Sequence, residues 1–258
     1  MNIYNIMWTG GLDSTYTMVM YSREEAKIQP YYFTNGRKSE KYELRAMDAI
    51  MKVIKDVPET KADILPLKVI NVSDIPADGA VDEAYRKLKD KGGLGSQYCW
   101  IARYVNNSGL DRLFYSAVKP RGYVSKLRQC IEENGGFLLN ESPEGRPFYT
   151  IDHEKSSEEV VTLFGHFCFS ETFDITKPEE EKRLRELGYG NAVDSTWICH
   201  TPVMGRPCGY CHPCGDAIDA GQTWRFTEGA LKRYKLYKSG AAPWKIRLMS
   251  YVDVLLGR

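Results

Sequence analysis

The sequence predicts an α/β protein built on a doubly wound parallel sheet. Short apolar runs alternate along the chain with amphipathic stretches of helical spacing. Turns rich in glycine or polar residues follow several of the apolar runs, and this strand, helix, strand order favours a parallel sheet with right-handed crossovers. Near the end of the chain the pattern stops, and four cysteines fall within sixteen residues. Such a cluster predicts a C-terminal metal-binding element.

Composition limits the classes of partner. The 258 residues are enough for one large domain with an appended element. Lys and Arg (35) balance Asp and Glu (34), so no global charge attracts nucleic acid or a membrane. No run of 18 apolar residues and no signal peptide is present, and we therefore expect a cytoplasmic protein without a membrane partner. Seven cysteines in such a protein indicate metal binding in a reducing compartment.

The first predicted strand, from Ile3 to Trp8, leads into the loop Thr9-Gly10-Gly11-Leu12-Asp13-Ser14, and a helix follows from Ser14 to Tyr21. The two glycines let a ligand approach the backbone, and the first amides of the helix attract an anion. Thr9 and Ser14 add hydroxyl donors, and the Asp13 carboxylate can hold Mg²⁺. This loop therefore predicts a phosphate site, although a simple turn with a helix cap explains the same residues.

The next segments continue the alternation of predicted strands and helices. A second strand from Gln29 to Phe33 ends in a polar turn that carries Arg37, at the edge of the sheet where ligands bind in open α/β folds. A helix is expected from Ser39 to Lys55 and a third strand from Leu65 to Val72.

The middle of the chain offers further cations. Residues 91–96 are glycine-rich and serve equally as a closing loop or as a connector. A helix from Gln97 to Asn107 precedes a fourth strand, Leu113 to Val118, which delivers Lys119 and Arg121 at its carboxyl end. These cations can neutralise phosphates or a substrate carboxylate. Equally, they can be ordinary surface residues of a solvated loop.

After a helix ending at Asn134, a Gly/Pro-rich stretch predicts a connector and the best domain boundary. Helices are expected from Glu158 to Phe169 and from Glu179 to Leu187. We therefore divide the chain into a nucleotide-binding core (residues 1–134), a connector with helices that complete the α/β domain (135–195), and a zinc-binding element with a helical tail (196–258).

The cysteine cluster is the most specific pattern in the chain. Cys208, Cys211 and Cys214 are each three residues apart, and Cys199 precedes them across a gap that contains Pro202, Gly205 and Pro207. Four thiolates in a closed tetrahedron describe a structural Zn²⁺ site. A redox pair and an iron–sulfur site are the alternatives.

The segment Thr9-Gly10-Gly11-Leu12-Asp13-Ser14-Thr15 resembles the Ser-Gly-Gly-x-Asp-Ser signature of the PP-loop ATP pyrophosphatases, with Thr9 in place of serine. The resemblance implies that the loop binds the pyrophosphate of ATP and that a carboxylate is adenylated. It also implies an adenine nucleotide alpha-hydrolase-like fold and the cofactors ATP and Mg²⁺. The implied ATP-binding residues are Thr9, Gly10, Gly11, Leu12, Asp13, Ser14, Thr15 and Phe33.

A second resemblance narrows the family. Thr196-Trp197-x-Cys199 with Pro207-Cys208-Gly209-x-Cys211-x-x-Cys214 is similar to the zinc motif of the 7-cyano-7-deazaguanine synthases of queuosine biosynthesis. These ligases convert 7-carboxy-7-deazaguanine and ammonia to a nitrile. The similarity covers residues 3–35 and 184–215, whereas the family's segments after the second strand and before the fourth are replaced. A divergent relative with a changed acid or amine is therefore expected.

The implied chemistry assigns catalysis to Asp13, Ser14 and Lys119, and contacts with the acid to Arg37 and Arg121. One alternative is a PP-loop ligase that joins a deazaguanine-like acid to an amine on a macromolecule. Another is a non-catalytic RNA-binding module that uses the basic, aromatic tail from Lys232 to Lys238. The expected partners are a small acid and ammonia or an amine; a homodimer and a nucleic acid or protein acceptor stay open.

Overall fold

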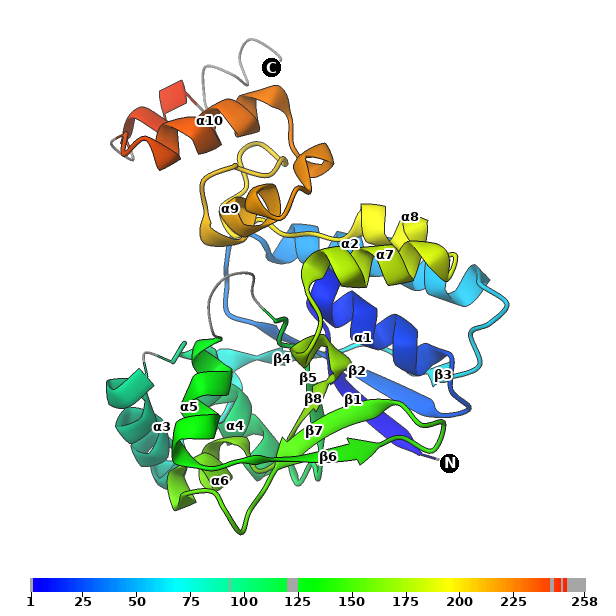
Figure 1. Cartoon of the computed structure of the whole chain (residues 1–258), viewed down its shortest axis with the longest axis vertical. Helices are drawn as coiled ribbons and strands as arrows, with labels where there is room; N and C mark the ends of the chain where they lie inside the picture. Colours follow the sequence, from blue (N-terminus) through cyan, green and yellow to red (C-terminus); the bar gives the residue numbers. More distant parts are fainter. Residues whose placement is uncertain (1, 93, 120–124, 242–243, 247, 250–258) are drawn as a thin grey trace.

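The computed structural model of the chain describes residues 2–92, 94–119, 125–241, 244–246 and 248–249. It is an α/β structure with a mostly parallel central sheet, which confirms the predicted class (Figure 1). Within these residues the sheet has eight strands, in the order β3-β2-β1-β5-β8-β7-β6, with β4 also paired to β2. In chain order the strands are β1 (Ile3–Met7), β2 (Lys27–Thr34), β3 (Asp63–Ile64), β4 (Lys68–Asn71), β5 (Leu113–Tyr115), β6 (Phe137–Glu141), β7 (Pro147–Ile151) and β8 (Phe167–Ser170).

Strand β1 is the point at which the strand order reverses. From β1 the chain moves outward to β2, β3 and β4 on one side, and it then returns to β5, which pairs with β1 on the other side. All of these pairs are parallel, as is β5 with β8. The connections after β1 and β5 therefore leave the sheet in opposite directions, and open α/β sheets bind ligands in the crevice that this creates.

Helices cover both faces of the sheet, as Figure 1 shows. One apolar core lies beneath α1, α2, α7 and α8, and a second lies beneath α3, α4, α5 and α6. Strand β2 serves both cores because successive side chains alternate: Ile28 and Tyr32 enter the first, Tyr31 and Phe33 the second. The helices are α1 (Leu12–Ser22), α2 (Glu40–Asp56), α3 (Gly79–Gly92), α4 (Gln97–Ser108), α5 (Lys126–Asn134), α6 (Glu158–Phe164), α7 (Lys177–Glu186), α8 (Gly190–Ser195), α9 (His212–Asp219) and α10 (Glu228–Lys238). Short 3₁₀ turns are η1 (Val72–Asp74), η2 (Glu171–Phe173) and η3 (Thr223–Arg225).

Two predictions of local structure are wrong. The stretch expected to be a connector holds the hairpin of β6 and β7, which extends the sheet antiparallel to β8. The helix expected to run to Phe169 ends at Phe164, and residues 167–170 form β8. All four residues of β8 are buried, and a short, wholly buried apolar run does not reveal from its spacing whether it is strand or helix.

The C-terminal element, from Thr196 onward, stands apart from the sheet (Figure 1). It contains α9, η3 and α10. Thr227 is the N-cap of helix α10, and its side chain accepts a hydrogen bond from the Ala230 amide. In the parts of the chain that the structure describes, no helix combines the length and the apolar character needed to cross a bilayer.

Candidate functional site

The loop between β1 and α1 has the shape expected of an anion site. Gly10 has φ +69°, and a Cβ atom there would lie 2.8 Å from the Glu43 carbonyl oxygen, so the position requires glycine. Gly11 is the N-cap of α1, and Leu12 opens the helix. The Thr9 amide donates to Ser14 Oγ at 3.2 Å, and the Thr9 and Ser14 hydroxyls lie 3.2 Å apart. The loop therefore presents glycine backbone, two hydroxyls and the first amides of an eleven-residue helix at one edge of the sheet.

Asp13, in the first turn of α1, forms an ion pair with Lys177 from the first turn of α7. Lys177 Nζ lies 2.9 Å from Asp13 Oδ1 and 3.2 Å from Oδ2. Burial lowers the pKa of Lys177, but the carboxylates of Asp13 and Glu180 outweigh burial, so this pKa lies above its usual value. Lys177 is therefore a fixed cation beside the loop.

Glu180, one helical turn after Lys177, is a fully buried carboxyl beside the carboxylate of Asp13. Burial, followed by repulsion from Asp13, raises its pKa well above the usual value, although Lys177 acts in the opposite direction. Two acids and one cation thus lie together under the loop.

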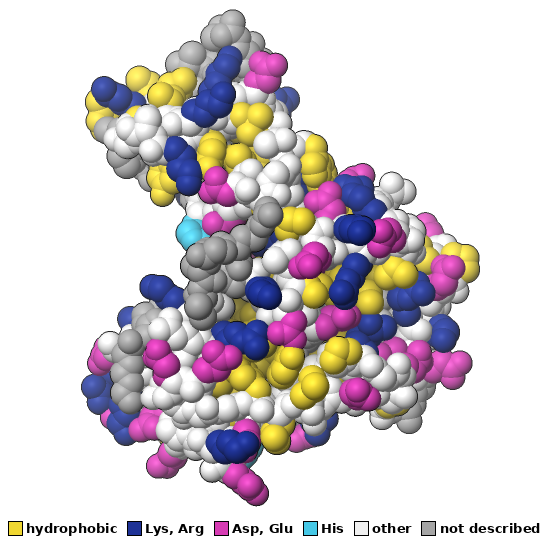
Figure 2. All heavy atoms as spheres, in the orientation of Figure 1, with side chains coloured by type: hydrophobic (Ala, Val, Ile, Leu, Met, Phe, Trp, Pro, Cys, Tyr) yellow, Lys and Arg dark blue, Asp and Glu magenta, His cyan; other side chains and the backbone are white. Residues whose placement is uncertain are grey.

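A cavity of about 410 Å³ extends from Asp13 and Lys177 to the C-terminal element. Its lining includes four aromatic rings, those of Phe33, Trp100, Tyr115 and Trp197. It also includes polar and charged side chains from the loop, from the strand ends and from the C-terminal element: Thr9, Asp13, Ser14, Asn35, Arg37, Glu43, Gln97, Ser116, Lys177, His200 and Gln222. In the space-filling view a concavity separates the lobe that carries α9 and α10 from the body that holds the sheet (Figure 2).

Arg37 lines the cavity but is already held by protein groups. Its guanidinium lies 2.5 Å from Glu43 Oε2, and it donates to the Phe33 carbonyl at 2.9 Å and to the Tyr32 hydroxyl at 2.9 Å. This network fixes the guanidinium at the carboxyl end of β2. Any contact between Arg37 and a ligand must use the part of the group that these bonds leave exposed.

The other residues predicted from sequence divide into two groups. Gly11, Leu12 and Phe33 line the cavity with Thr9, Asp13, Ser14 and Arg37. Thr15, in contrast, is fully buried, and its hydroxyl accepts a hydrogen bond from Trp8 Nε1. Lys119 has an exposed side chain and is not among the cavity-lining residues of the described chain. Arg121 lies outside the described residues.

Sequence reasoning missed Lys177. It lies 164 residues from Asp13 along the chain, in a charged run that predicts only a solvated helix face. The one local signal is the helix start: Thr176 caps α7, Glu179 completes the capping box, and Pro178 is in the first turn. That signal places Lys177 at the beginning of a helix but does not reveal what it faces.

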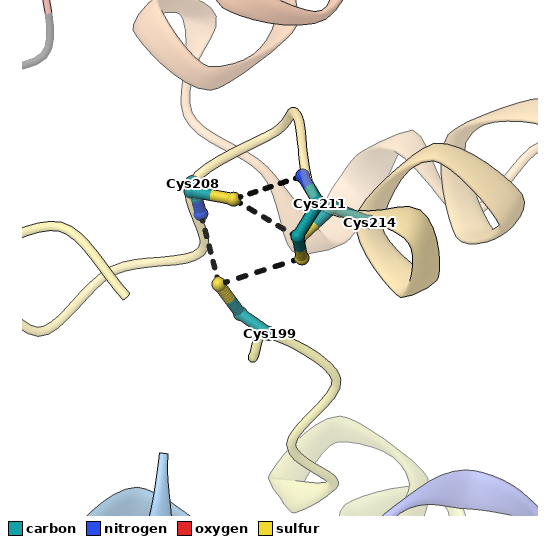
Figure 3. Close-up of side chains that lie close together, drawn as sticks. All are labelled: Cys199, Cys208, Cys211 and Cys214. Carbon is teal, nitrogen blue, oxygen red and sulfur yellow. Dashed lines mark hydrogen bonds between the residues drawn. The ribbon is translucent and has the colours of Figure 1, made fainter. Parts of the chain in front are cut away.

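The four predicted cysteines gather in the C-terminal element, as Figure 3 shows. Their sulfur atoms all lie within 4.8 Å of one another, with 3.9 Å between Cys208 and Cys214 and 4.0 Å between Cys211 and Cys199. Bonds of about 2.3 Å to a tetrahedral Zn²⁺ place sulfurs about 3.8 Å apart. The cluster can therefore hold a metal such as zinc.

Local contacts prepare these thiols for a metal. The Tyr210 and Cys211 amides donate to Cys208 Sγ at 3.4 and 3.2 Å, and the Cys208 amide donates to Cys199 Sγ at 3.2 Å. Hydrogen bonding among the four sulfurs lowers the pKa of Cys208 and Cys211 and raises the pKa of Cys199 and Cys214, so the thiols share their protons unequally. Amide donors stabilise thiolates, which are the form that binds zinc.

Helix α10 supports the turn between Cys208 and Cys211. Arg233 Nε donates to the Cys208 carbonyl at 2.8 Å. Gly209 has φ +82°, and a Cβ atom there would lie 2.1 Å from the Ala230 carbonyl oxygen. The turn is therefore packed directly on α10, which explains why glycine stands between the cysteines.

No protein-family model matches the chain, and no curated protein matches it either. Function must therefore be inferred from the chemistry of the site.

Proposed function

We propose that this protein is a PP-loop ATP pyrophosphatase that adenylates a carboxylate and passes it to a nitrogen nucleophile, in the manner of the 7-cyano-7-deazaguanine synthases. The observation that carries the proposal is the cavity beside β1, where the loop Thr9–Ser14 opens α1 next to the Asp13–Lys177 pair. The order of the strands about β1 also suits the adenine nucleotide alpha-hydrolase-like fold. Such a crevice is the usual ligand site of an open α/β sheet.

The loop supplies what a polyphosphate needs. Amides at the beginning of α1 and the Thr9 and Ser14 hydroxyls donate hydrogen bonds to phosphate oxygens. Lys177, and not Lys119, is the cation that neutralises phosphate charge in this proposal, because Asp13 holds its ammonium group at the cavity. A fixed cation stabilises negative charge that develops on the leaving pyrophosphate without reorganising during the reaction.

Asp13 fits the part of a Mg²⁺ ligand. Its carboxylate lines the cavity and is a hard oxygen donor of the kind that Mg²⁺ prefers. Bound there, Mg²⁺ would neutralise phosphate charge. Phe33 and Trp100 form a tilted aromatic pair with ring centroids 5.1 Å apart in the same cavity, and they offer an apolar surface to a purine.

The acid would lie toward the C-terminal element, within reach of Arg37 and His200, which both line the cavity. AMP transfer gives the carboxylate a leaving group that ammonia or an amine can displace. In the family that the sequence resembles, the acid is 7-carboxy-7-deazaguanine and the product is a nitrile. The altered turn Phe33-Thr34-Asn35-Gly36-Arg37-Lys38 lies at this part of the site and makes a different acid or amine compatible with the same ATP chemistry.

The nucleotide products test the class. After incubation with Mg²⁺-ATP, ammonia and a panel of aromatic acids that includes 7-carboxy-7-deazaguanine, chromatography should show AMP and pyrophosphate. Asp13→Asn keeps the side-chain shape but removes the charge, and turnover should fall by about 100-fold or more. Asp48→Asn, on the exposed face of α2, is the matched control and should react like the wild type. ADP as the dominant product, or full activity in Asp13→Asn, would contradict the proposal.

A second candidate is a ligase whose amine is carried by a macromolecule. Residues 196–246 contain seven Lys and Arg against three Asp and Glu, whereas the whole chain has a net charge of only +1. Trp224, Tyr237 and Trp244 are exposed in this segment. Basic residues among exposed aromatics suit a nucleic acid, so RNA-dependent AMP release in the same assay would favour this candidate.

A further inference from the structure

Trp197 of the C-terminal element lies against the loop Thr9–Ser14. We propose that Trp197 is a positioning residue that couples metal occupancy of the four-cysteine site to the conformation of the loop Thr9–Ser14. The consequence for nucleotide affinity rests on the function proposed above, whereas the coupling itself does not. Four contacts of Trp197 and its neighbours carry the inference.

The first contact is with the loop. The Trp197 amide donates to the Gly10 carbonyl at 2.9 Å, and a Cβ atom on Gly11 would lie 3.6 Å from the Trp197 carbonyl oxygen. The Trp197 backbone therefore lies against both glycines. Gly10 is buried, so loss of this donor would leave a buried carbonyl oxygen without a partner, which is unfavourable.

The second contact is with α2. The indole of Trp197 stacks on the Tyr42 ring, with centroids 4.7 Å apart and planes 15° apart. The same helix approaches the loop directly, because the Glu43 carbonyl oxygen lies 2.8 Å from where a Cβ on Gly10 would be. Helix α2 and Trp197 therefore hold the Gly10 turn between them.

The third contact leads to the metal site. Trp197 Nε1 donates to the carbonyl of Cys199 at 2.7 Å, so the indole is tied to a predicted metal ligand two residues away. Trp197, Ile198 and His200 all line the cavity. A displacement of Cys199 would therefore also displace Trp197 and Ile198, which line the cavity.

The fourth contact shows which part of this segment depends on the metal. Before Trp197 the chain is fixed by Arg225, whose guanidinium donates to the Thr196 carbonyl at 3.2 Å and to its hydroxyl at 2.7 Å. After Trp197 the small apolar core consists of the buried cysteines 199, 208 and 214 with a few partly buried neighbours. Four thiols without a metal give little apolar burial, so the segment from Cys199 to Cys214 depends on metal for its stability. Trp197 therefore lies between the residue that Arg225 fixes, Thr196, and the metal-dependent segment that begins at Cys199.

Hydrogen exchange of the full chain tests this coupling. Amides of residues 10–14 are compared between zinc-loaded protein and protein treated with a chelator, with no nucleotide present. We expect exchange in the loop to rise about tenfold or more on zinc removal while β1 and β2 stay protected. Unchanged loop exchange in a sample that has lost its zinc would overturn the proposal.

Zinc removal can unfold more than the C-terminal element, so a variant of the zinc-loaded protein provides the second test. Trp197→Phe keeps a ring for Tyr42 and the backbone amide for Gly10, but it removes the bond to the Cys199 carbonyl. Loop exchange should rise several-fold in this variant, with protection of the strands and the zinc content unchanged. Trp244→Phe, at a residue that is 64% exposed, is the control and should leave exchange unchanged. Equal exchange in Trp197→Phe and wild type would overturn the coupling.

Titration with Mg²⁺-ATP separates this inference from the proposed function. Weaker ATP binding in Trp197→Phe, together with faster loop exchange, supports both. If ATP binds neither protein but loop exchange still responds to zinc, the coupling stands and the assigned function fails. Weaker ATP binding without any change in loop exchange would overturn the route through the loop.

Discussion

At the scale of single residues, the site depends on charges that only the folded chain brings together. Asp13 is recognisable from its loop, but Lys177 and Glu180 come from a helix that begins 164 residues later. Glu180 is the most unusual group, because it is fully buried beside a second carboxylate, that of Asp13. Burying a carboxylate next to a like charge costs free energy unless it takes up a proton.

This environment makes stability depend on pH through Glu180. Its pKa is raised in the folded protein, so the folded state holds this proton more tightly than the unfolded state does. The contribution stabilises the protein below the usual glutamate pKa of about 4.3 and is lost as the pH rises through the folded pKa. Glu180→Gln removes this cost. We therefore expect the variant to melt above wild type at pH 8, by about 2–4 °C per kcal/mol, with a smaller difference at pH 5.

Differential scanning calorimetry of the full chain at the two pH values measures this effect. Glu186→Gln, on the same helix with its side chain 61% exposed, is the control and should show no difference that depends on pH. A Glu180→Gln protein that is destabilised equally at pH 5 and pH 8 would show that Glu180 is charged and needed in the folded state.

At the scale of elements, the C-terminal element has two roles. It gathers four cysteines, of which Cys208 and Cys211 flank a turn packed against α10, and it supplies one wall of the cavity through Trp197, Ile198 and His200. The spacing of the cysteines predicts the first role because the thiols fall on short turns within sixteen residues. The second role could not be predicted from the sequence, since it depends on where the element packs relative to the sheet.

The metal is expected to be one zinc per chain. Cys211→Ser replaces a soft ligand with a hydroxyl, so the protein should lose zinc and be destabilised by about 3 kcal/mol or more. Cys99→Ser is the matched control, because Cys99 is a half-buried cysteine of α4 whose thiol donates to Asp82 outside the cluster. Elemental analysis and thermal melting measure both variants. Iron in place of zinc in fresh wild type, or full zinc content in Cys211→Ser, would contradict the assignment.

At the scale of the whole molecule, much of the parallel part of the sheet is predictable and its antiparallel edge is not. Strands β1 and β2 and the helix α1 between them are predictable, because the spacing of apolar residues changes clearly from that of a strand to that of a helix and back. The third predicted strand, Leu65 to Val72, corresponds to the shorter β4, which is preceded by the two-residue β3. The hairpin of β6 and β7 was missed because Pro143 and Gly145 in its turn and Pro147 at the start of β7 also mark connectors.

The cavity, too, is only partly predictable from the sequence. The loop residues that line the cavity were predicted because they are contiguous and are of types that can contact phosphate. The remaining half combines α4, α7 and the C-terminal element, which are far apart in the chain. Only packing reveals that Trp100, Lys177 and Gln222 share one cavity with Asp13.

Exchange of labelled pyrophosphate into ATP tests the central claim most directly, because only a reversible transfer of AMP to an acid allows it. With Mg²⁺-ATP, 7-carboxy-7-deazaguanine and no amine, the wild type should incorporate label into ATP. Lys177→Met should lower the rate by about 100-fold, because the cation beside the phosphates is lost. Lys182→Met, which changes a lysine of the same helix that is 74% exposed, should retain the rate. An enzyme that releases ADP and orthophosphate in place of AMP and pyrophosphate would contradict the adenylate mechanism.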